Sequence, residues 1–115
     1  MVVNDIIKIV KGEIIFEGDL EAEVNTACGS DMMSDVLAFV KDQSVLLTGL
    51  VNPQVVRTAE MMDMVCIVFV RGKVPDETMI NLARSKGITL ISTPLRMFTA
   101  CGLLYSNGLD GGCDI

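Results

Sequence analysis

An apolar run at residues 65–70 constrains the fold of this chain more than any other feature. It reads Val-Cys-Ile-Val-Phe-Val without any polar alternation, and the polar turn Arg71-Gly72-Lys73 follows it. An alternating strand exposes one face to water, whereas a continuous apolar run is typical of a strand that is covered on both faces. The run therefore predicts an inner strand of a parallel sheet. Its turn then lies at the carboxyl end, where ligands of open α/β sheets usually bind.

The size and composition of the chain suit one such domain. It has 115 residues, of which 50% are hydrophobic, and its mean hydropathy is +0.51. Aromatic residues make up only 4%, so aliphatic and methionine side chains must fill the core. No apolar run reaches the roughly 20 residues of a membrane span, and the start of the chain does not resemble a signal peptide. We therefore expect a cytoplasmic protein with no membrane attachment.

The charge balance limits the classes of partner and of chemistry. A formal net charge of −6 repels phosphate backbones, so nucleic-acid binding is not expected. The chain has no histidine, which removes Ser-His and Cys-His nucleophile pairs and the usual zinc patterns. The sequence predicts no catalytic residues, no metal site and no cofactor, and we expect the protein not to be an enzyme.

The first third of the chain reads as helix, strand, strand and helix. Residues 2–10 have helical apolar spacing, and residues 13–17 form a short strand between charged ends. Alternating apolar residues predict a half-exposed strand over residues 20–29. Ser30 or Asp31 can then cap a helix. The residues that we expect on its core-facing side are Met32, Met33, Val36, Leu37 and Val40.

Two consecutive units then share one plan. A buried strand over residues 45–48 leads to Thr48-Gly49 and to a helix that Asn52 caps and Pro53 begins. The strand at 65–70 leads in the same way to Arg71-Gly72 and to a helix that begins near Pro75. We expect Val55, Val56, Ala59, Met62 and also Met61 to face inward from the first of these helices.

A third unit completes the chain. Residues 88–91 form the last strand, and Ser92-Thr93-Pro94 repeats the signal of a cap followed by proline. The apolar residues expected along the following helix are Leu95, Phe98, Cys101, Leu104 and Tyr105. Residues 109–115 read as a flexible tail, which leaves a domain of residues 1–108. The predicted fold is a single α/β domain with a mainly parallel sheet flanked by helices on both faces.

The best candidate site is the rim formed by the three strand ends. The predicted ligand-binding residues are Thr48, Gly49, Asn52, Arg71, Gly72, Lys73, Ser92 and Thr93. Each loop precedes a helix start, where free backbone N–H groups and the helix dipole attract anions, and Arg71 and Lys73 add positive charge. A small anionic ligand such as a nucleotide or phosphate could bind there. The alternative is that these are ordinary turn and cap residues with solvated cations.

Cysteine and methionine residues suggest two further properties. Cys28 stands before a helix start and could be a reactive thiol, although Asp31 nearby opposes a lowered pKa and no base is present. An alternative function is therefore a cysteine-based redox or metal-linked accessory protein that uses Cys28 with Cys101 or Cys113. The methionines are too many, and some too close in sequence, for all to point inward. The apolar surface left outside suggests a homodimer.

Three segments of the second half resemble the DRTGG domain family, and also the N-terminal domain of HPr kinase/phosphorylase. They are Cys-Ile-Val-Phe-Val-Arg-Gly-Lys-Val-Pro at 66–75, Ile-Asn-Leu-Ala at 80–83 and Gly-Ile-Thr-Leu-Ile-Ser-Thr at 87–93. Leu46-Leu47-Thr48-Gly49 also fits, so the resemblance covers about residues 45–104. The chain departs from the pattern in lacking a literal Asp-Arg-Thr-Gly-Gly run.

The resemblance implies a non-catalytic module. DRTGG domains accompany CBS-domain pyrophosphatases and phosphate acetyltransferases as regulatory or dimerising parts, and the P-loop kinase domain of HPr kinase is absent from this sequence. A domain that stands by itself can find its partner protein in another chain. Short stand-alone relatives occur beside iron-hydrogenase and redox proteins, so the resemblance also allows an accessory role in an anaerobic electron-transfer or hydrogenase system.

Overall fold

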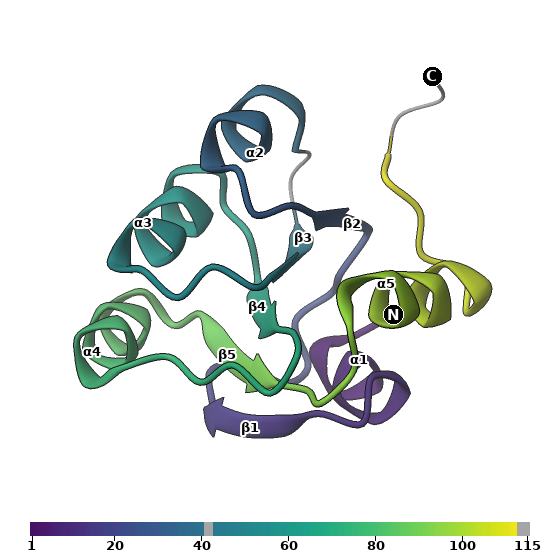
Figure 1. Cartoon of the computed structure of the whole chain (residues 1–115), viewed down its shortest axis with the longest axis horizontal. Helices are drawn as coiled ribbons and strands as arrows, with labels where there is room; N and C mark the ends of the chain where they lie inside the picture. Colours follow the sequence, from purple (N-terminus) through teal and green to yellow (C-terminus); the bar gives the residue numbers. More distant parts are fainter. Residues whose placement is uncertain (41–42, 113–115) are drawn as a thin grey trace.

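The computed structural model describes residues 1–40 and 43–112, which form one α/β domain (Figure 1). Within these residues the helices are α1 (Val3–Ile9), α2 (Met33–Phe39), α3 (Pro53–Met61), α4 (Glu77–Lys86) and α5 (Met97–Ser106). The strands are β1 (Glu13–Phe16), β2 (Thr26–Gly29), β3 (Ser44–Thr48), β4 (Cys66–Phe69) and β5 (Thr89–Ser92).

The strands form one sheet in the order β1-β5-β4-β3-β2. Strands β2, β3, β4 and β5 run parallel to one another. Strand β1, at one edge of the sheet, runs antiparallel to β5. Strand β4 occupies the centre, and every residue in it is buried. The prediction of an inner parallel strand within residues 65–70 is therefore confirmed.

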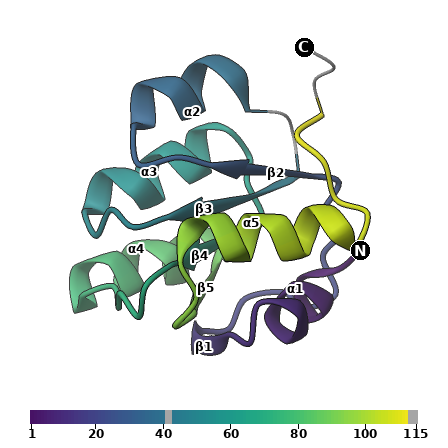
Figure 2. The same cartoon turned by 45° about the vertical axis from the view of Figure 1, so that its right-hand side comes forward.

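Helices cover both faces of the sheet, as the apolar character of its strands requires. Cys66 and Val68 of β4 face α1 and α5, whereas Ile67 and Phe69 face α2, α3 and α4. Figures 1 and 2 show the two helical layers on opposite sides of the strands. Each layer closes its own apolar core, and the predicted α/β class with helices on both faces is confirmed.

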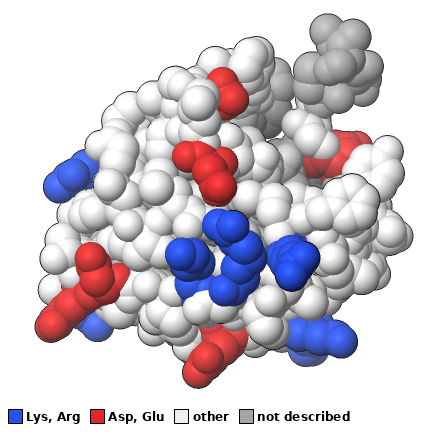
Figure 3. Space-filling view, in the orientation of Figure 1, with Lys and Arg blue, Asp and Glu red and all other residues white. Residues whose placement is uncertain are grey.

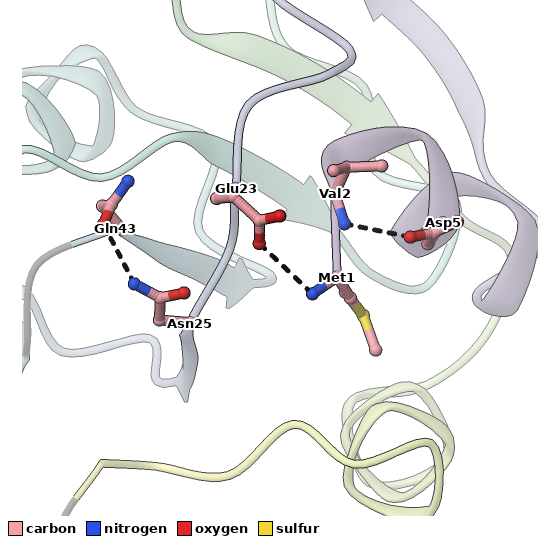
Figure 4. A network of polar contacts seen from close by, with 6 residues as sticks. All are labelled: Met1, Val2, Asp5, Glu23, Asn25 and Gln43. Atoms are coloured by element: carbon pink, nitrogen blue, oxygen red, sulfur yellow. Dashed lines mark hydrogen bonds and ion pairs between the residues drawn. The ribbon is translucent and has the colours of Figure 1, made fainter.

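The predicted strand over residues 20–29 is wrong in its first part. Only residues 26–29 join the sheet, and the backbone before them bonds to the start of the chain. Val3 N–H donates to the Ala22 carbonyl at 3.1 Å, and Val24 N–H donates to the Met1 carbonyl at 2.7 Å. Figure 4 shows this junction, where the Met1 amino group lies 3.5 Å from Glu23 Oε2. The alternation correctly predicted the side of this segment that faces the core, because Val24 is buried. It did not predict which backbone groups the segment would bond to.

The predicted start and core face of the second helix also need correction. Met32, not Ser30 or Asp31, holds the N-cap position of α2, and it has no side-chain cap bond. Of the predicted inward residues only Val36 is fully buried, while Met32 and Leu37 are exposed. The reason is position, because α2 follows the edge strand β2 and packs beside α3, so only a narrow strip of it reaches the core.

The proline-containing turns after β3 and β4 lead into side-chain-capped helices, whereas the turn after β5 does not. Asn52 caps α3 by accepting from Gln54 N–H at 2.8 Å, as predicted. After β5, however, neither Ser92 nor Thr93 caps a helix, and α5 begins only after Arg96. Thr93 is buried and donates its hydroxyl to the Val10 carbonyl at 2.6 Å instead. This tertiary bond replaces the predicted cap.

Three apolar residues on two helices are exposed, and one of them, Met61, was expected to face inward. Met61 at the end of α3, and Phe98 and Tyr105 on α5, all lie on the surface. At the end of the described chain Leu109 is buried and Asp110 bridges to Thr26 beside β2. Residues 113–115 of the predicted tail lie outside the described residues.

Candidate anion-binding rim

The three turns after β3, β4 and β5 lie side by side at the carboxyl ends of these strands. We call this region the rim (residues 48–52, 70–76 and 92–96). Parallel pairing of the three strands brings their carboxyl ends together. Backbone bonds then join the turns directly. Val70 N–H donates to the Thr48 carbonyl at 3.0 Å, and Gly72 N–H donates to the Thr93 carbonyl at 2.8 Å. The predicted site residues are therefore spatial neighbours.

Arg71 is held in place from two sides. Its backbone has a φ of +59°, a left-handed conformation that is uncommon for arginine, and its N–H donates to the Leu95 carbonyl at 2.7 Å. Its guanidinium group packs directly over Gly49, where an added Cβ would collide with Nη2. A glycine at position 49 is therefore what allows the guanidinium group to reach from the β4 turn across the β3 turn.

The side chains of Arg71 and Lys73 are free to meet a ligand. Both residues are exposed, and within residues 1–40 and 43–112 neither side chain has an ion-pair partner. Figure 3 shows Lys and Arg side chains gathered near the middle of one face, over the turn that follows β4. Arg96, at the N-cap of α5, adds an exposed cation next to the carbonyl that binds Arg71 N–H. Sequence reasoning missed Arg96, because the predicted helix start lay before it.

Asp31 is the second residue that sequence reasoning missed, because it was considered as a helix cap and as a neighbour of Cys28 but not as part of the rim. Its Oδ1 accepts from Gly49 N–H at 2.7 Å and from the Thr48 hydroxyl at 3.1 Å. An internal carboxylate thus already satisfies the donors of the β3 turn, where an anionic ligand was expected. No local pattern in the sequence predicts these contacts, because Thr48 and Gly49 lie 17 and 18 residues after Asp31 in the chain.

The remaining predicted residues hold the rim together. Asn52 accepts from Gln54 N–H in the first turn of α3, and Asp76 accepts from Met79 N–H in the first turn of α4, so these two donors are already used. The Ser92 hydroxyl donates to the Lys73 carbonyl at 2.7 Å. The exposed side chains of Arg71, Lys73 and Arg96 contribute positive charge at this rim.

The cysteines among the described residues lie in surroundings that favour the neutral thiol. Burial raises the pKa of Cys28, with smaller contributions from Cys101 and Asp35. Burial also raises the pKa of Cys101, and it raises that of Cys66 to about 12. A reactive thiol needs the opposite shift. In the described part of the chain, no three Cys, Asp or Glu residues are grouped to hold a metal ion, and Cys113 lies outside that part.

No helix among the described residues has the length and apolar character needed to cross a membrane.

Comparisons with known proteins agree with this fold. The family model of the DRTGG domain matches residues 5–106. A crystal structure of the CBS and DRTGG domains of the regulatory region of Clostridium perfringens pyrophosphatase, complexed with the activator diadenosine tetraphosphate, aligns with a TM-score of 0.76 at 18% identity. The alignment covers 90% of this chain and 45% of that chain, so this chain spans less than half of that chain's length. No curated protein matches the sequence. The match over residues 5–106 shows that the chain belongs to the DRTGG domain family.

Proposed function

We propose that this chain is a non-catalytic regulatory and assembly module that binds a small anionic ligand, a nucleotide or phosphate-like compound, at the rim. The observation that carries the proposal is the pair of exposed cations, Arg71 and Lys73, which have no counter-ion among the described residues. They stand in a chain with a net charge of −6. An oriented guanidinium group binds phosphate through paired hydrogen bonds, which a mobile surface arginine forms less readily.

The position of Asp31 supports placing the proposed ligand over the β4 turn and not over the β3 turn. Its carboxylate repels an anion from Thr48 and Gly49, whose donors it already occupies. In the β4 turn, carbonyl groups of the neighbouring loop accept the N–H groups of Arg71 and Gly72, and the Asp76 carboxylate is bonded to Met79 N–H at the start of α4. The ligand therefore binds over Arg71 and Lys73, with Arg96 beside them. Thr48, Gly49, Asn52, Gly72, Ser92 and Thr93 support the site by holding the turns.

The structural relative supports nucleotides as the first ligands to test. That regulatory region contains a DRTGG domain and was crystallised with diadenosine tetraphosphate, which is described as its activator. We extend to this chain only the class of ligand, a polyphosphate with an organic group. Because such compounds are cytoplasmic metabolites, we expect the module to act in the cytoplasm.

We further propose that the module acts as a homodimer and transmits ligand binding to a partner protein in trans. Two large aromatic side chains, Phe98 and Tyr105, are exposed on α5. An exposed apolar patch formed by such side chains marks a site of protein association.

Ligand binding can be tested by thermal unfolding followed by calorimetric titration. The compounds are inorganic phosphate, pyrophosphate, acetyl phosphate, ATP and diadenosine tetraphosphate. A ligand at a hundred times its Kd stabilises the folded protein by about 2.7 kcal/mol. We expect the wild type to respond to at least one compound and Arg71→Ala to lose the response. Arg57→Ala, which removes an exposed arginine from α3, is the matched control and should respond as the wild type does.

Two results would reject the ligand proposal. One is a wild-type protein that none of the five compounds stabilises. The other is a stabilisation that Arg57→Ala reduces as much as Arg71→Ala does, because such a response reflects general charge and not the rim.

A further inference from the structure

Helix α5 has the composition of a helix that is covered on all sides. Its ten residues, Met97–Ser106, include no charged side chain, and apolar residues occur all around it. A helix that is apolar all round is normally buried. In this chain only Ala100 and Leu104 are fully buried against the sheet. Figure 2 shows α5 lying across the sheet beside α1 with its outer side turned away from the domain.

The outer side of α5 carries two aromatic rings on one stripe. Phe98 is 90% exposed and Tyr105 is 73% exposed. Residues seven apart lie on nearly the same side of a helix, so both rings point the same way. Gly102 lies between them, and an added Cβ there would meet open space. The stripe therefore reads ring, small residue, ring, and the glycine allows another backbone to approach closely.

A pocket of about 140 Å³ opens beside the second ring. It lies between α5 and β2, and its lining includes Gly29, Cys101, Tyr105 and Leu109. Phe98 projects from the same helix about two turns earlier. One surface thus carries both an aromatic side chain that projects and a hollow of mixed polar and apolar lining that could receive one. A two-fold interface needs this property, because each copy must contribute both members of every contact.

We infer that the outer face of α5 is the surface through which two copies of this chain associate, with the two α5 helices packed antiparallel. Phe98 of each copy inserts beside Tyr105 of the other, and Gly102 lies near the two-fold axis. The inference rests on the dimeric assembly proposed above and specifies its surface. An aromatic side chain seated in a pocket is the typical energetic centre of such an interface.

The charges at the two ends of α5 fit an antiparallel pair. Exposed Arg96 stands at its N-terminal end, and exposed Asp110 follows its C-terminal end. Antiparallel packing brings the basic end of one helix toward the acidic end of the other, and it also aligns their dipoles favourably. A second copy therefore suits this face better than a uniformly charged partner does.

The length of the helix sets the expected strength of the dimer. Ten residues span only about 15 Å, so the contact falls short of the roughly 800 Å² per partner of a standard interface. We expect a reversible dimer with a Kd in the micromolar range, about 1–100 µM.

Sedimentation velocity over a concentration series across that range tests the inference. We expect Phe98→Glu to weaken the dimer at least about tenfold, because two carboxylates would have to enter the pockets. Phe39→Glu is the matched control, since Phe39 is 72% exposed on α2, and it should leave the Kd unchanged. Gly102→Ala should weaken the dimer while raising the melting temperature of the monomer, because alanine favours a helix more than glycine does.

The possible outcomes distinguish failure of the α5 surface from failure of the homodimer itself. A wild-type dimer that survives both Phe98→Glu and Tyr105→Glu overturns the α5 surface but leaves the dimer standing. A wild-type chain that stays monomeric across the series overturns the dimer as well. Neither result bears on ligand binding by Arg71 and Lys73, which ligand titration of the same samples measures separately.

Discussion

The turns after β3 and β4 begin from the same local plan and reach opposite electrostatic states. Each runs from a buried strand through a polar residue and a glycine toward a helix that follows a proline. In the first turn, Gly49 N–H and the Thr48 hydroxyl donate to the carboxylate of Asp31. In the second, Arg71 and Gly72 donate their N–H groups to the carbonyls of Leu95 and Thr93. The first turn is thus occupied by a charge, and the second keeps its cations available.

The difference shows that the neighbouring strand decides which groups bond to a βα turn. The β3 turn lies next to the loop after β2, which supplies Asp31. The β4 turn lies next to the loop after β5, which supplies only neutral carbonyl groups to its backbone. Carbonyl acceptors shape a turn without cancelling the positive charge of its side chains. We therefore assign ligand binding to the second turn and a structural role to the first.

The largest effect should come from removing the free cation. Arg71→Ala should weaken pyrophosphate binding by about 2 kcal/mol, roughly thirtyfold, because a charge-assisted pair of hydrogen bonds is lost. Calorimetric titration measures the affinity, and urea unfolding should reveal little change in stability, since the side chain is exposed. A large loss of stability with unchanged affinity would reverse the roles that we give to the two turns.

Removing the internal carboxylate should have the converse effect. Asp31→Ala leaves Gly49 N–H and the Thr48 hydroxyl without their acceptor, so we expect a loss of about 1–2 kcal/mol in the free energy of unfolding. Urea denaturation gives the value. Asp35→Ala, which removes another exposed carboxylate from the first turn of α2, serves as the control. Equal losses of unfolding free energy in the two variants would mean that the bonds from Asp31 to the β3 turn do not contribute to stability.

Alanine substitutions at the two turn glycines, Gly72 and Gly49, should affect different properties, stability at the first and ligand affinity at the second. Gly72 has a φ of +70°, and an added Cβ meets nothing, so Gly72→Ala should cost about 1 kcal/mol through backbone strain. At Gly49 an added Cβ meets the end of the flexible Arg71 side chain, which can move. Gly49→Ala should therefore reduce pyrophosphate affinity more than it reduces stability. The comparison fails if both variants lower the melting temperature alike and bind equally well.

The smallest effect should come from neutralising Asp31 without removing its oxygen. Asn in its place can still accept from Gly49 N–H, but the negative charge next to Gly49, over which the guanidinium group packs, disappears. We expect Asp31→Asn to strengthen pyrophosphate binding about threefold at low salt, or roughly 0.6 kcal/mol, and to lose this gain as salt screens the charge. An affinity that falls instead would show that the carboxylate helps to orient Arg71.

Local patterns predicted the parts of the fold that depend on neighbours in sequence. The unbroken apolar run predicted the buried centre of the sheet, and Asn52 with Pro53 predicted the start of α3. Prediction failed where a distant group competed for the same atom. Thr93 gives its hydroxyl to the Val10 carbonyl instead of capping a helix, and the backbone near Ala22 bonds to the start of the chain. The candidate site follows the same division, since Arg71 and Lys73 were predicted and Asp31 was not.

By itself, the sequence determined which segments are buried, where most helices begin, and that cations follow the central strand. These properties arise from side-chain hydrophobicity and from caps a few residues away. Only the tertiary structure decided that Asp31 lies against the β3 turn, that Arg71 reaches over Gly49, and that Phe98 and Tyr105 remain exposed on one side of α5. The order of strands in the sheet sets which loops and which helix faces meet, and strand order depends on packing across the whole chain.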